Sequence, residues 1–226
     1  MPLEAVAELR ASVYGLLGEL FLRPTEQRFD RIVQEAGRVQ ESPRLGQGFP
    51  FEPSLRSLLR ELTSATEDRL TSFRQDYRKL LTPSGGDTVC LPYESRLVGD
   101  REAQGAVAAD VERAYAESGL AISGAATVEL PDHVGLELQF LCLLCVEEAS
   151  CWSSEDRVEA HAWLRRQQAF LRAHVARFVP ALTRCVRRRA PEDSLVRELV
   201  EVSHAFVVHD ADLVATLLGI DAEEDS

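Results

Sequence analysis

Residues 3–22 read LEAVAELRASVYGLLGELFL, and the apolar side chains of this stretch recur at steps of three and four. That spacing places them on one face of an α-helix, not on alternate faces of a strand. The stripe consists of Val6, Leu9, Val13, Leu16, Leu17, Leu20 and Phe21. Pro24 follows it, and because proline lacks a backbone donor we expect the helix to end there. This first segment is therefore predicted to be an amphipathic helix.

The same spacing recurs through most of the chain. Further helices are predicted near residues 25–36, 55–62, 70–81, 102–117, 131–152, 153–179, 192–208 and 210–218. Pro180 is expected to kink or end the long helix 153–179, and Gly219 to follow the last helix as its C-cap. No stretch alternates with period two between turn residues, so no sheet is predicted. The predicted fold class is all-α, a single globular helical bundle.

The composition excludes several classes of protein. Acidic residues outnumber basic ones by 37 to 25 in the 226 residues, so binding to nucleic acid or to an anionic membrane would work against repulsion. No apolar run is long enough to span a bilayer, and residues 1–8 do not resemble a secretory signal. The five cysteines are an odd number, so a closed disulfide framework is not expected. We therefore expect a cytoplasmic protein without a nucleic-acid or membrane partner.

Residues 82–101 form a connector without helical periodicity. A connection of this length is uncommon in a compact domain unless it serves as a binding loop or a linker. We expect one domain over residues 1–226, with two loose lobes at about 1–82 and 101–220 on either side of this loop. Exchange of a lobe between two copies would give a dimer, so a monomer and a domain-exchanged dimer both remain open.

Cys142, Cys145 and Cys151 could supply thiolates to zinc or to an iron–sulfur cluster. They lie in the most apolar predicted helix, where cysteine acts as a small hydrophobic residue, and a closed zinc site needs four ligands. Glu201-x-x-His204 has the spacing of a di-iron ligand pair, but no second pair of this kind is present. No metal ligands are therefore assigned, and a metal- or redox-active helical protein is kept as the alternative.

Other sites for chemistry are not found. The glycine-rich loops that bind nucleotide phosphates and the Gly-x-Ser-x-Gly motif of serine hydrolases are both missing. The remaining constellation is a helix start at Asp132 and His133, with Glu137 one turn further on. Such a start can hold a cationic group through charge-assisted hydrogen bonds. The same residues can equally serve as a helix cap beside a partly buried histidine, and the two interpretations stay open at this point.

The stretch around this helix start resembles the signature of the TorD/DmsD/NarJ family, the cytoplasmic chaperones of molybdenum-containing oxidoreductases. It reads Glu129-Leu130-Pro131-Asp132-His133, followed by Gly135-Leu136-Glu137-Leu138-Gln139-Phe140-Leu141. Four more segments resemble family positions in the same order, namely Tyr14-x-x-Leu17-x-x-Leu20-Phe21, Asp76-Tyr77-x-x-Leu80-Leu81, Pro92-Tyr93-Glu94-Ser95 and Gln168-x-Phe170-Leu171-x-x-His174. Phe178 departs from the family, in which many members have tryptophan at this place.

The resemblance implies an all-helical chaperone that performs no catalysis and needs no cofactor of its own. Such a chaperone binds the precursor of the catalytic subunit of a molybdenum-containing oxidoreductase, often through its twin-arginine leader, and assists cofactor insertion before export. Carried over to this sequence, the peptide-binding residues are Tyr77, Leu91, Pro92, Tyr93, Glu94, Pro131, Asp132, His133 and Glu137. We expect the carboxylates to meet the basic end of a leader, and Tyr77, Leu91 and Tyr93 to meet its apolar stretch.

Overall fold

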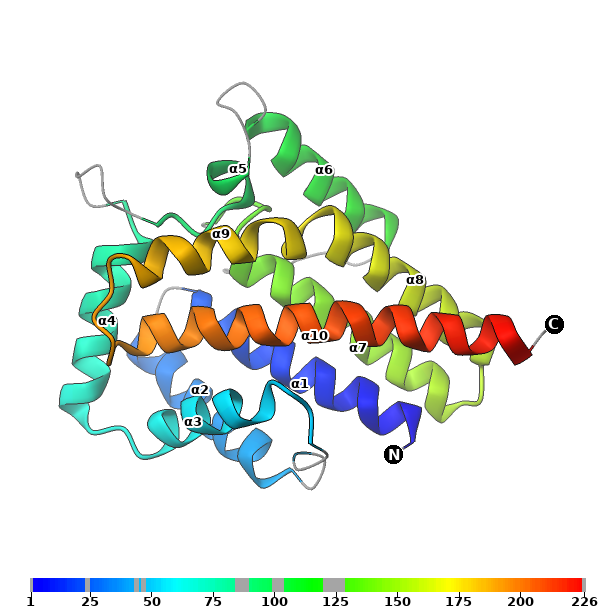
Figure 1. The fold of residues 1–226 in the computed structure, drawn as a ribbon, viewed down its shortest axis with the longest axis horizontal. Helices are drawn as coiled ribbons and strands as arrows, with labels where there is room; N and C mark the ends of the chain where they lie inside the picture. The colour runs from blue at the N-terminus through cyan, green and yellow to red at the C-terminus, as the bar shows by residue number, and fades with distance from the viewer. Residues whose placement is uncertain are drawn as a thin grey trace.

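A computed structural model of the chain describes residues 2–22, 25–42, 45, 48–83, 90–98, 104–119 and 129–224, without the side chains of residues 26, 27, 104 and 220–224. In this part of the chain it contains ten helices and no strand, which confirms the all-α prediction (Figure 1). The helices are α1 (Leu3–Phe21), α2 (Glu26–Glu41), α3 (Glu52–Thr63), α4 (Glu67–Leu81), α5 (Glu94–Leu97), α6 (Gln104–Glu117), α7 (Val134–Ser153), α8 (Arg157–Ala173), α9 (Val175–Arg187) and α10 (Leu195–Glu224).

Short polar side chains set where several helices begin. The hydroxyl oxygens of Thr25 and Thr66 accept the N–H groups of Arg28 and Arg69, each at 3.3 Å, at the starts of α2 and α4. Asp156 caps α8 in the same way. Each cap satisfies one of the amides that a helix start leaves without a partner. The connector at residues 82–101 is less irregular than expected, because it contains α5, although its residues 84–89 and 99–101 lie outside the described residues.

The predicted helix 153–179 is wrong in one respect, because the break falls at His174 and not at Pro180. His174 leaves the helical conformation, with φ −125° and ψ −90°, between α8 and α9. Its ring contacts the carboxylate of Glu94 at 2.8 Å. Pro180 lies inside α9 and does not end it. The break thus coincides with a contact between His174 and Glu94, which are 80 positions apart. Helical periodicity depends only on local sequence and does not predict such a contact.

The expected pair of helices at 192–208 and 210–218 is also wrong, because α10 runs without a break to Glu224. Gly219 lies inside α10 and is not a C-cap. Asp210, at the expected break, is fully buried and accepts hydrogen bonds from Arg10 and Tyr14. Since its polar side chain is satisfied by a distant helix, it does not need to interrupt its own helix.

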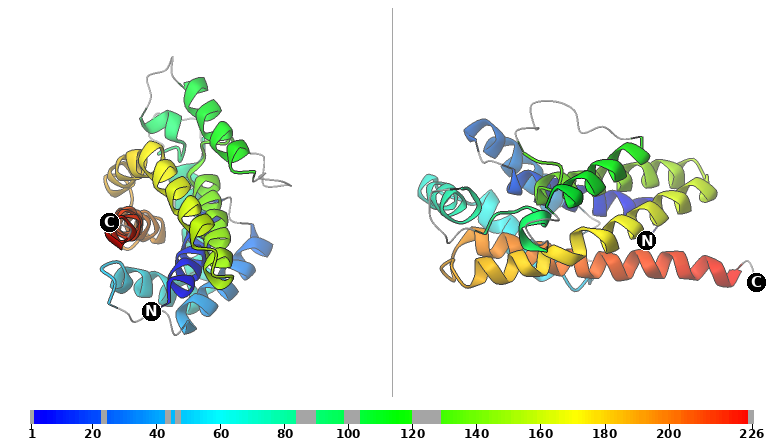
Figure 2. Two further views of the ribbon diagram at one scale, coloured as in Figure 1. Left: turned by 90° about the vertical axis from the view of Figure 1, so that its right-hand side faces the viewer. Right: turned by 90° about the horizontal axis from the view of Figure 1, so that it is seen from above.

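Four helices form a closed ring around the centre of the protein. α1 packs along α7, α7 against α8, α8 against α10, and α10 against α1. α10 crosses the whole length of the molecule, and α4 stands across one end (Figure 1). The end-on view shows α6 projecting from one side of the molecule (Figure 2, left). One buried apolar cluster contains residues from every helix except α5, whose Leu97 packs against it, so the core is continuous across these helices.

Each helix of the ring contributes one polar side chain to a buried network. These residues are Arg10, Glu148, Gln167 and Asp210, and none is more than 2% exposed. The Nη1 of Arg10 donates to Glu148 at 2.6 Å, and its Nη2 donates to Asp210 at 3.1 Å and to Gln167. A buried charge is tolerated only when it is paired and hydrogen-bonded. The network therefore favours one register of the four helices over others.

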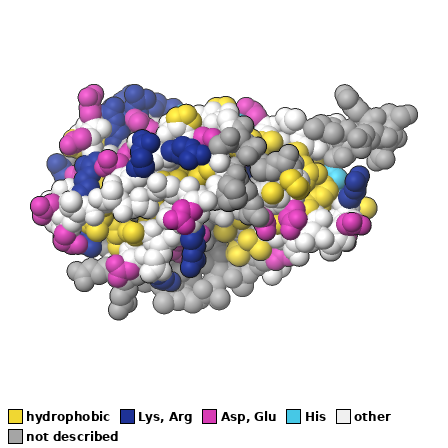
Figure 3. Space-filling view, turned by 90° about the horizontal axis from the view of Figure 1, so that it is seen from below, with side chains coloured by type: hydrophobic (Ala, Val, Ile, Leu, Met, Phe, Trp, Pro, Cys, Tyr) yellow, Lys and Arg dark blue, Asp and Glu magenta, His cyan; other side chains and the backbone are white. Residues whose placement is uncertain are grey.

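The surface carries charges of both signs. Seen from below, acidic and basic side chains are interspersed among apolar ones, and the described part of this face has no large field of one sign (Figure 3). Within the described residues, no helix combines the length and the apolar character that a membrane-crossing segment needs.

Candidate functional site

Two segments that are distant in the sequence, residues 90–98 and 129–137, meet beside the start of α7. Tyr93 and His133 form an isolated antiparallel β-bridge between them, flanked by two backbone hydrogen bonds of 2.9 Å. The rings of the two residues also meet edge to face, with centroids 5.0 Å apart. The structure thus brings together the two motifs on which the family resemblance depends.

Two side chains fix the geometry where these segments meet. His133 is the N-cap of α7, and its Nδ1 accepts the N–H two residues further on at 3.0 Å. Asp132 does not cap α7. Its Oδ2 instead accepts, at 2.9 Å, the backbone N–H of Ser95, which lies in the first turn of α5. The expected helix start at Pro131 is therefore too early, and α7 begins at Val134.

Three carboxylates lie in the interior at this point. Glu94 is 1% exposed, and Asp132 and Glu137 are 0% exposed. Glu94 has two partners where α8 meets α9. Its Oε2 lies 2.8 Å from Nδ1 of His174, and its Oε1 lies 3.9 Å from Nη1 of Arg177. Within the described residues, Oδ1 of Asp132 and both carboxylate oxygens of Glu137 have no hydrogen-bond partner. We call Glu94, Asp132 and Glu137 the acidic cluster.

Burial and mutual repulsion disfavour the ionised form of Glu137 in the acidic cluster. Burial raises the pKa of Glu137 well above its ordinary value, and the charges of Glu94 and Asp132 raise it further. The pKa of the Tyr115 hydroxyl is raised for the same reasons, first by burial and then by the three carboxylates. A positive group that entered this place would relieve the repulsion and satisfy the unpaired oxygens.

Aromatic rings and a cavity border the acidic cluster. The hydroxyl of Tyr115 donates to the carbonyl of Pro131 at 2.9 Å, and its ring packs on Phe140 with centroids 4.6 Å apart. A cavity of about 350 Å³ opens between α6 and α8, and Phe170 and His174 line it together with Arg166 and Glu117. Because His174 contacts both this cavity and Glu94, it separates the solvent side of the site from the buried carboxylates.

The remaining predicted residues take different positions. Pro92 is buried, while Leu91, Tyr93 and Pro131 are partly exposed. Tyr77 lies on α4, where its hydroxyl donates to the carbonyl of Phe21 at 2.6 Å. The end of α4 contacts segment 90–98, because the backbone N–H of Cys90 donates to the carbonyl of Leu80 at 2.7 Å.

Sequence reasoning missed His174, Arg177 and Tyr115 as neighbours of the acidic cluster. His174 had a signal, because it closes the last segment of the family resemblance. Tyr115 and Arg177 had none, since each occupies an ordinary helical position and is brought to the site only by the packing of α6 and α9.

The cysteines of α7 do not form a metal centre in the described part of the chain, where no group of three or more His, Cys, Asp or Glu side chains can hold a metal ion. Cys145 is fully buried, and burial raises the pKa of its thiol. Burial likewise raises the pKa of Cys142 to about 11. Neutral buried thiols are poor ligands because metals bind the thiolate. The described geometry therefore gives no support to the metal- or redox-active alternative built on Cys142, Cys145 and Cys151.

One disulfide is present, although the sequence gave no reason to pair any two of the five cysteines. Cys90 is bonded to Cys185 across 95 positions of sequence, while Cys142, Cys145 and Cys151 are free thiols. Spacing along the chain gave no means of pairing two cysteines this far apart.

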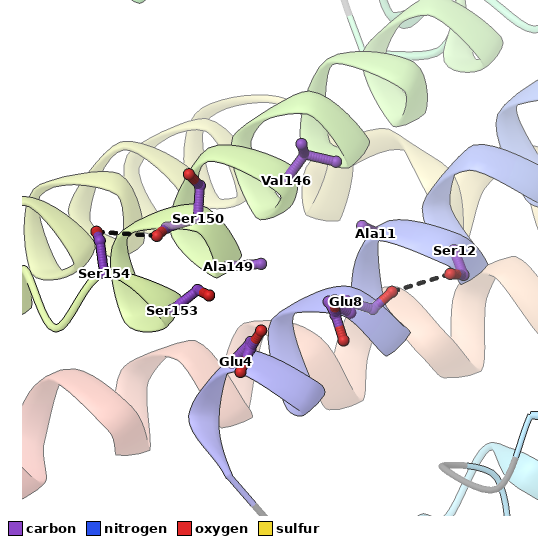
Figure 4. A pocket seen from close by; sticks show the side chains of 9 residues that line it. All are labelled: Glu4, Glu8, Ala11, Ser12, Val146, Ala149, Ser150, Ser153 and Ser154. Atoms are coloured by element: carbon purple, nitrogen blue, oxygen red, sulfur yellow. Dashed lines mark hydrogen bonds between the residues drawn. The ribbon is translucent and has the colours of Figure 1, made fainter.

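A larger hollow of about 640 Å³ lies between α1 and α7 (Figure 4). Glu4 and Glu8 of α1 face the serine-rich end of α7 across it. The hydroxyls of Ser12 and Ser154 are used within their own helices, donating to the carbonyls of Glu8 and Ser150 at 2.9 and 3.0 Å. The hollow lies on the face of α1 and α7 and does not include the segments 90–98 and 129–137, where the family motifs meet.

Comparison with known proteins identifies the family. The family model described as "Nitrate reductase delta subunit" matches residues 50–184, more than half of the chain and including every element of the site. The chain belongs to the nitrate reductase delta subunit family. No curated protein matches it. This family is of the NarJ/TorD type, whose members are molybdoenzyme maturation chaperones and not enzymes. The resemblance drawn from the Pro-Asp-His and Pro-Tyr-Glu-Ser motifs is thereby confirmed.

Proposed function

We propose that this nitrate reductase delta family chaperone binds the immature catalytic subunit of a molybdenum-containing oxidoreductase at the acidic cluster. The leader of that subunit, with paired arginines before an apolar stretch, is the proposed ligand. The chaperone would hold the precursor until the cofactor has been inserted and export can follow. The observation that carries this proposal is the set of unpaired carboxylate oxygens on Asp132 and Glu137, deep in the segment where the family motifs meet.

The chemistry of the site supports an arginine in particular. A guanidinium group is always charged and presents five N–H donors, so it can satisfy several carboxylate oxygens at once. Glu94, Asp132 and Glu137 offer such oxygens in a place from which water is excluded. The rings of Tyr93 and Phe170 and the cavity beside His174 provide apolar area for the stretch that follows the arginines.

Binding at this place requires a local displacement. Because Asp132 and Glu137 are fully buried, a ligand reaches them only if residues 90–98 move away from residues 129–137. Segments held by a few backbone hydrogen bonds open locally at a small fraction of the cost of global unfolding. The chaperone is thus proposed to open locally around its ligand.

The proposal is tested by titrating the full chain with a synthetic peptide that carries two adjacent arginines and an apolar stretch. In the double variant Glu94→Ala/Asp132→Ala, affinity should fall by at least about tenfold, the loss expected for a charge-assisted hydrogen bond. The matched control is Glu192→Ala/Asp193→Ala, which removes two exposed carboxylates and the same net charge. Calorimetry gives the affinities, and circular dichroism verifies that each variant is folded. If the affinity of the first variant stays within about twofold of the control, this assignment is wrong.

A second peptide, in which both arginines are replaced by glutamine, separates charge recognition from apolar binding. We expect it to bind the unmodified chain as weakly as the arginine peptide binds Glu94→Ala/Asp132→Ala. Equal binding of the two peptides to the unmodified chain would show that the acidic cluster does not recognise the arginines.

A further inference from the structure

The Cys90–Cys185 disulfide joins the ligand-binding segment to α9. Cys90 begins the described segment 90–98, and its Cα lies 5.8 Å from that of Cys185 near the end of α9. Four residues after Cys90, Glu94 contacts His174 at the beginning of the same helix. α9 therefore holds this segment at two points, once through a covalent bond and once through a contact of the acidic cluster.

The other attachments of the segment are ordinary hydrogen bonds. Four of them run from Cys90 to Leu80, from Val134 to Pro92 and from Glu94 and Ser95 to Asp132, with lengths of 2.7–2.9 Å. The hydroxyl of Tyr93 also donates to the carboxylate of Glu129. Burial and, after it, the charges of Glu94 and Asp132 raise the pKa of Glu137, so the ionised carboxylates repel one another and work against these attachments. The Cys90–Cys185 bond is thus the strongest attachment that keeps Glu94 close to Asp132 and Glu137.

The two sulfur atoms differ in accessibility. Cys90 is fully buried, whereas Cys185 is partly exposed on the surface of α9. Nη1 of Arg189 lies 3.4 Å from Sγ of Cys185, and Arg184 and Arg188 come from the same stretch of the chain. Positive charge near a cysteine sulfur favours the thiolate form. The partly exposed end of the disulfide is thus Cys185, where a reductant attacks, and the positive charge there favours departure of the Cys185 thiolate in the second step.

We propose that Cys90 and Cys185 form a reversible redox site, and that reduction by a dithiol releases residues 90–98 and opens the acidic cluster to the precursor. The inference rests on the proposed function for the identity of the ligand, but not for the redox chemistry. The structure with the disulfide formed corresponds to the closed state, in which the cluster is buried.

The exchange proceeds in two balanced steps. A thiolate of the dithiol attacks Sγ of Cys185, the protein S–S bond breaks, and Cys90 leaves as a thiolate that takes up a proton. The second thiolate of the reductant then attacks the mixed disulfide, and Cys185 leaves and is protonated in turn. Two electrons pass from the dithiol to the protein, so the reductant becomes a disulfide and the protein gains two thiols.

The first experiment counts thiols. After treatment with oxidised glutathione, the full chain is denatured in the presence of N-ethylmaleimide, which labels free thiols. Its mass is then measured by mass spectrometry. Three labels are expected, on Cys142, Cys145 and Cys151, and five after reduction with dithiothreitol. Five labels after oxidation would show that the pair does not form, and the proposal would be overturned.

The second experiment measures amide hydrogen exchange in residues 90–98 and 129–137. Reduction of the unmodified chain, and separately the variant Cys185→Ser, should each speed exchange of these amides by about tenfold or more. The matched control, Cys151→Ser, changes a free thiol and should keep the rates of the oxidised protein. Equal rates in the oxidised and reduced protein would refute the release of the segment.

The arginine peptide then separates this inference from the proposed function. Reduction should tighten its binding by about tenfold, because the competent state becomes the populated one. Faster exchange on reduction together with no peptide binding in either state would contradict the proposed function while leaving the redox site intact. Peptide binding that is the same in both states would instead contradict the gating and leave the proposed function intact.

Discussion

Arg10 on α1 and Asp210 on α10 stand 200 residues apart and are joined by two hydrogen bonds, from Nε to Oδ1 at 2.5 Å and from Nη2 to Oδ2 at 3.1 Å. Burial opposes the charge of Arg10, but the attraction of Asp210 and other acidic neighbours outweighs burial and raises the pKa of the guanidinium. This pair closes the ring of four helices, because it links α10 to α1 directly.

Loss of Asp210 should therefore destabilise the whole bundle. Asp210→Ala leaves the guanidinium of Arg10 with less compensation, and removal of one partner of a buried pair costs about 3–5 kcal/mol. Asp212→Ala is the matched control, since Asp212 is exposed on the same helix and its removal should cost less than about 0.5 kcal/mol. Urea unfolding followed by circular dichroism measures both. A loss below about 1 kcal/mol for Asp210→Ala would contradict the role of the pair.

His174→Ala should destabilise the protein and loosen the site. The change removes the contact of His174 with Oε2 of Glu94 and leaves a buried carboxylate poorly compensated, at a cost of about 1–3 kcal/mol. His161→Ala, in the preceding helix, removes a partly exposed histidine whose ring contacts Trp152, and it serves as the control. Hydrogen exchange should show the loss of protection concentrated in α5 and the start of α9. Uniform loss over the whole chain would indicate a different cause.

Glu137 should make stability depend on pH. Since its pKa is raised in the folded protein, the folded state retains a proton that the unfolded state releases. Above the unfolded-state value of about 4.3, its contribution to the free energy of unfolding falls as pH rises towards the folded-state pKa. Glu137→Gln removes this titration, so the variant should gain stability relative to the unmodified chain as pH rises above about 4.3. Urea unfolding over that range measures the difference, and parallel pH profiles would refute it.

Gly18 should not tolerate alanine, although alanine is the better helix former. A Cβ at Gly18 would lie 2.8 Å from Nε2 of Gln139 and 3.0 Å from the carbonyl of Gly135, where α1 crosses α7. Gly37 on α2 has nothing within 4 Å of such a Cβ, so Gly37→Ala should stabilise the protein by about 0.5–1 kcal/mol. Thermal unfolding should thus shift in opposite directions for the two variants. Stabilisation by Gly18→Ala would show that the two helices can separate without cost.

The sequence by itself determined the helical class and the family. Apolar residues at steps of three and four, as in residues 3–22, depend only on the local geometry of the helix. They predicted helical segments in these places, although α8 and α9 were predicted as one helix and α10 as two. The Pro-Asp-His and Pro-Tyr-Glu-Ser motifs led to the family that the family model confirmed.

Tertiary structure alone decided where helices break and which groups meet. The break at His174, the unbroken helix through Asp210 and the pairing of Cys90 with Cys185 each involve a partner at least 80 residues away. The same holds for the burial of Glu137, which the sequence placed on a helix start without showing that the charge of Glu94 acts on it. Periodicity reports only which face of a helix is apolar, whereas these contacts depend on how four helices pack against one another, and that packing is set by the whole chain at once.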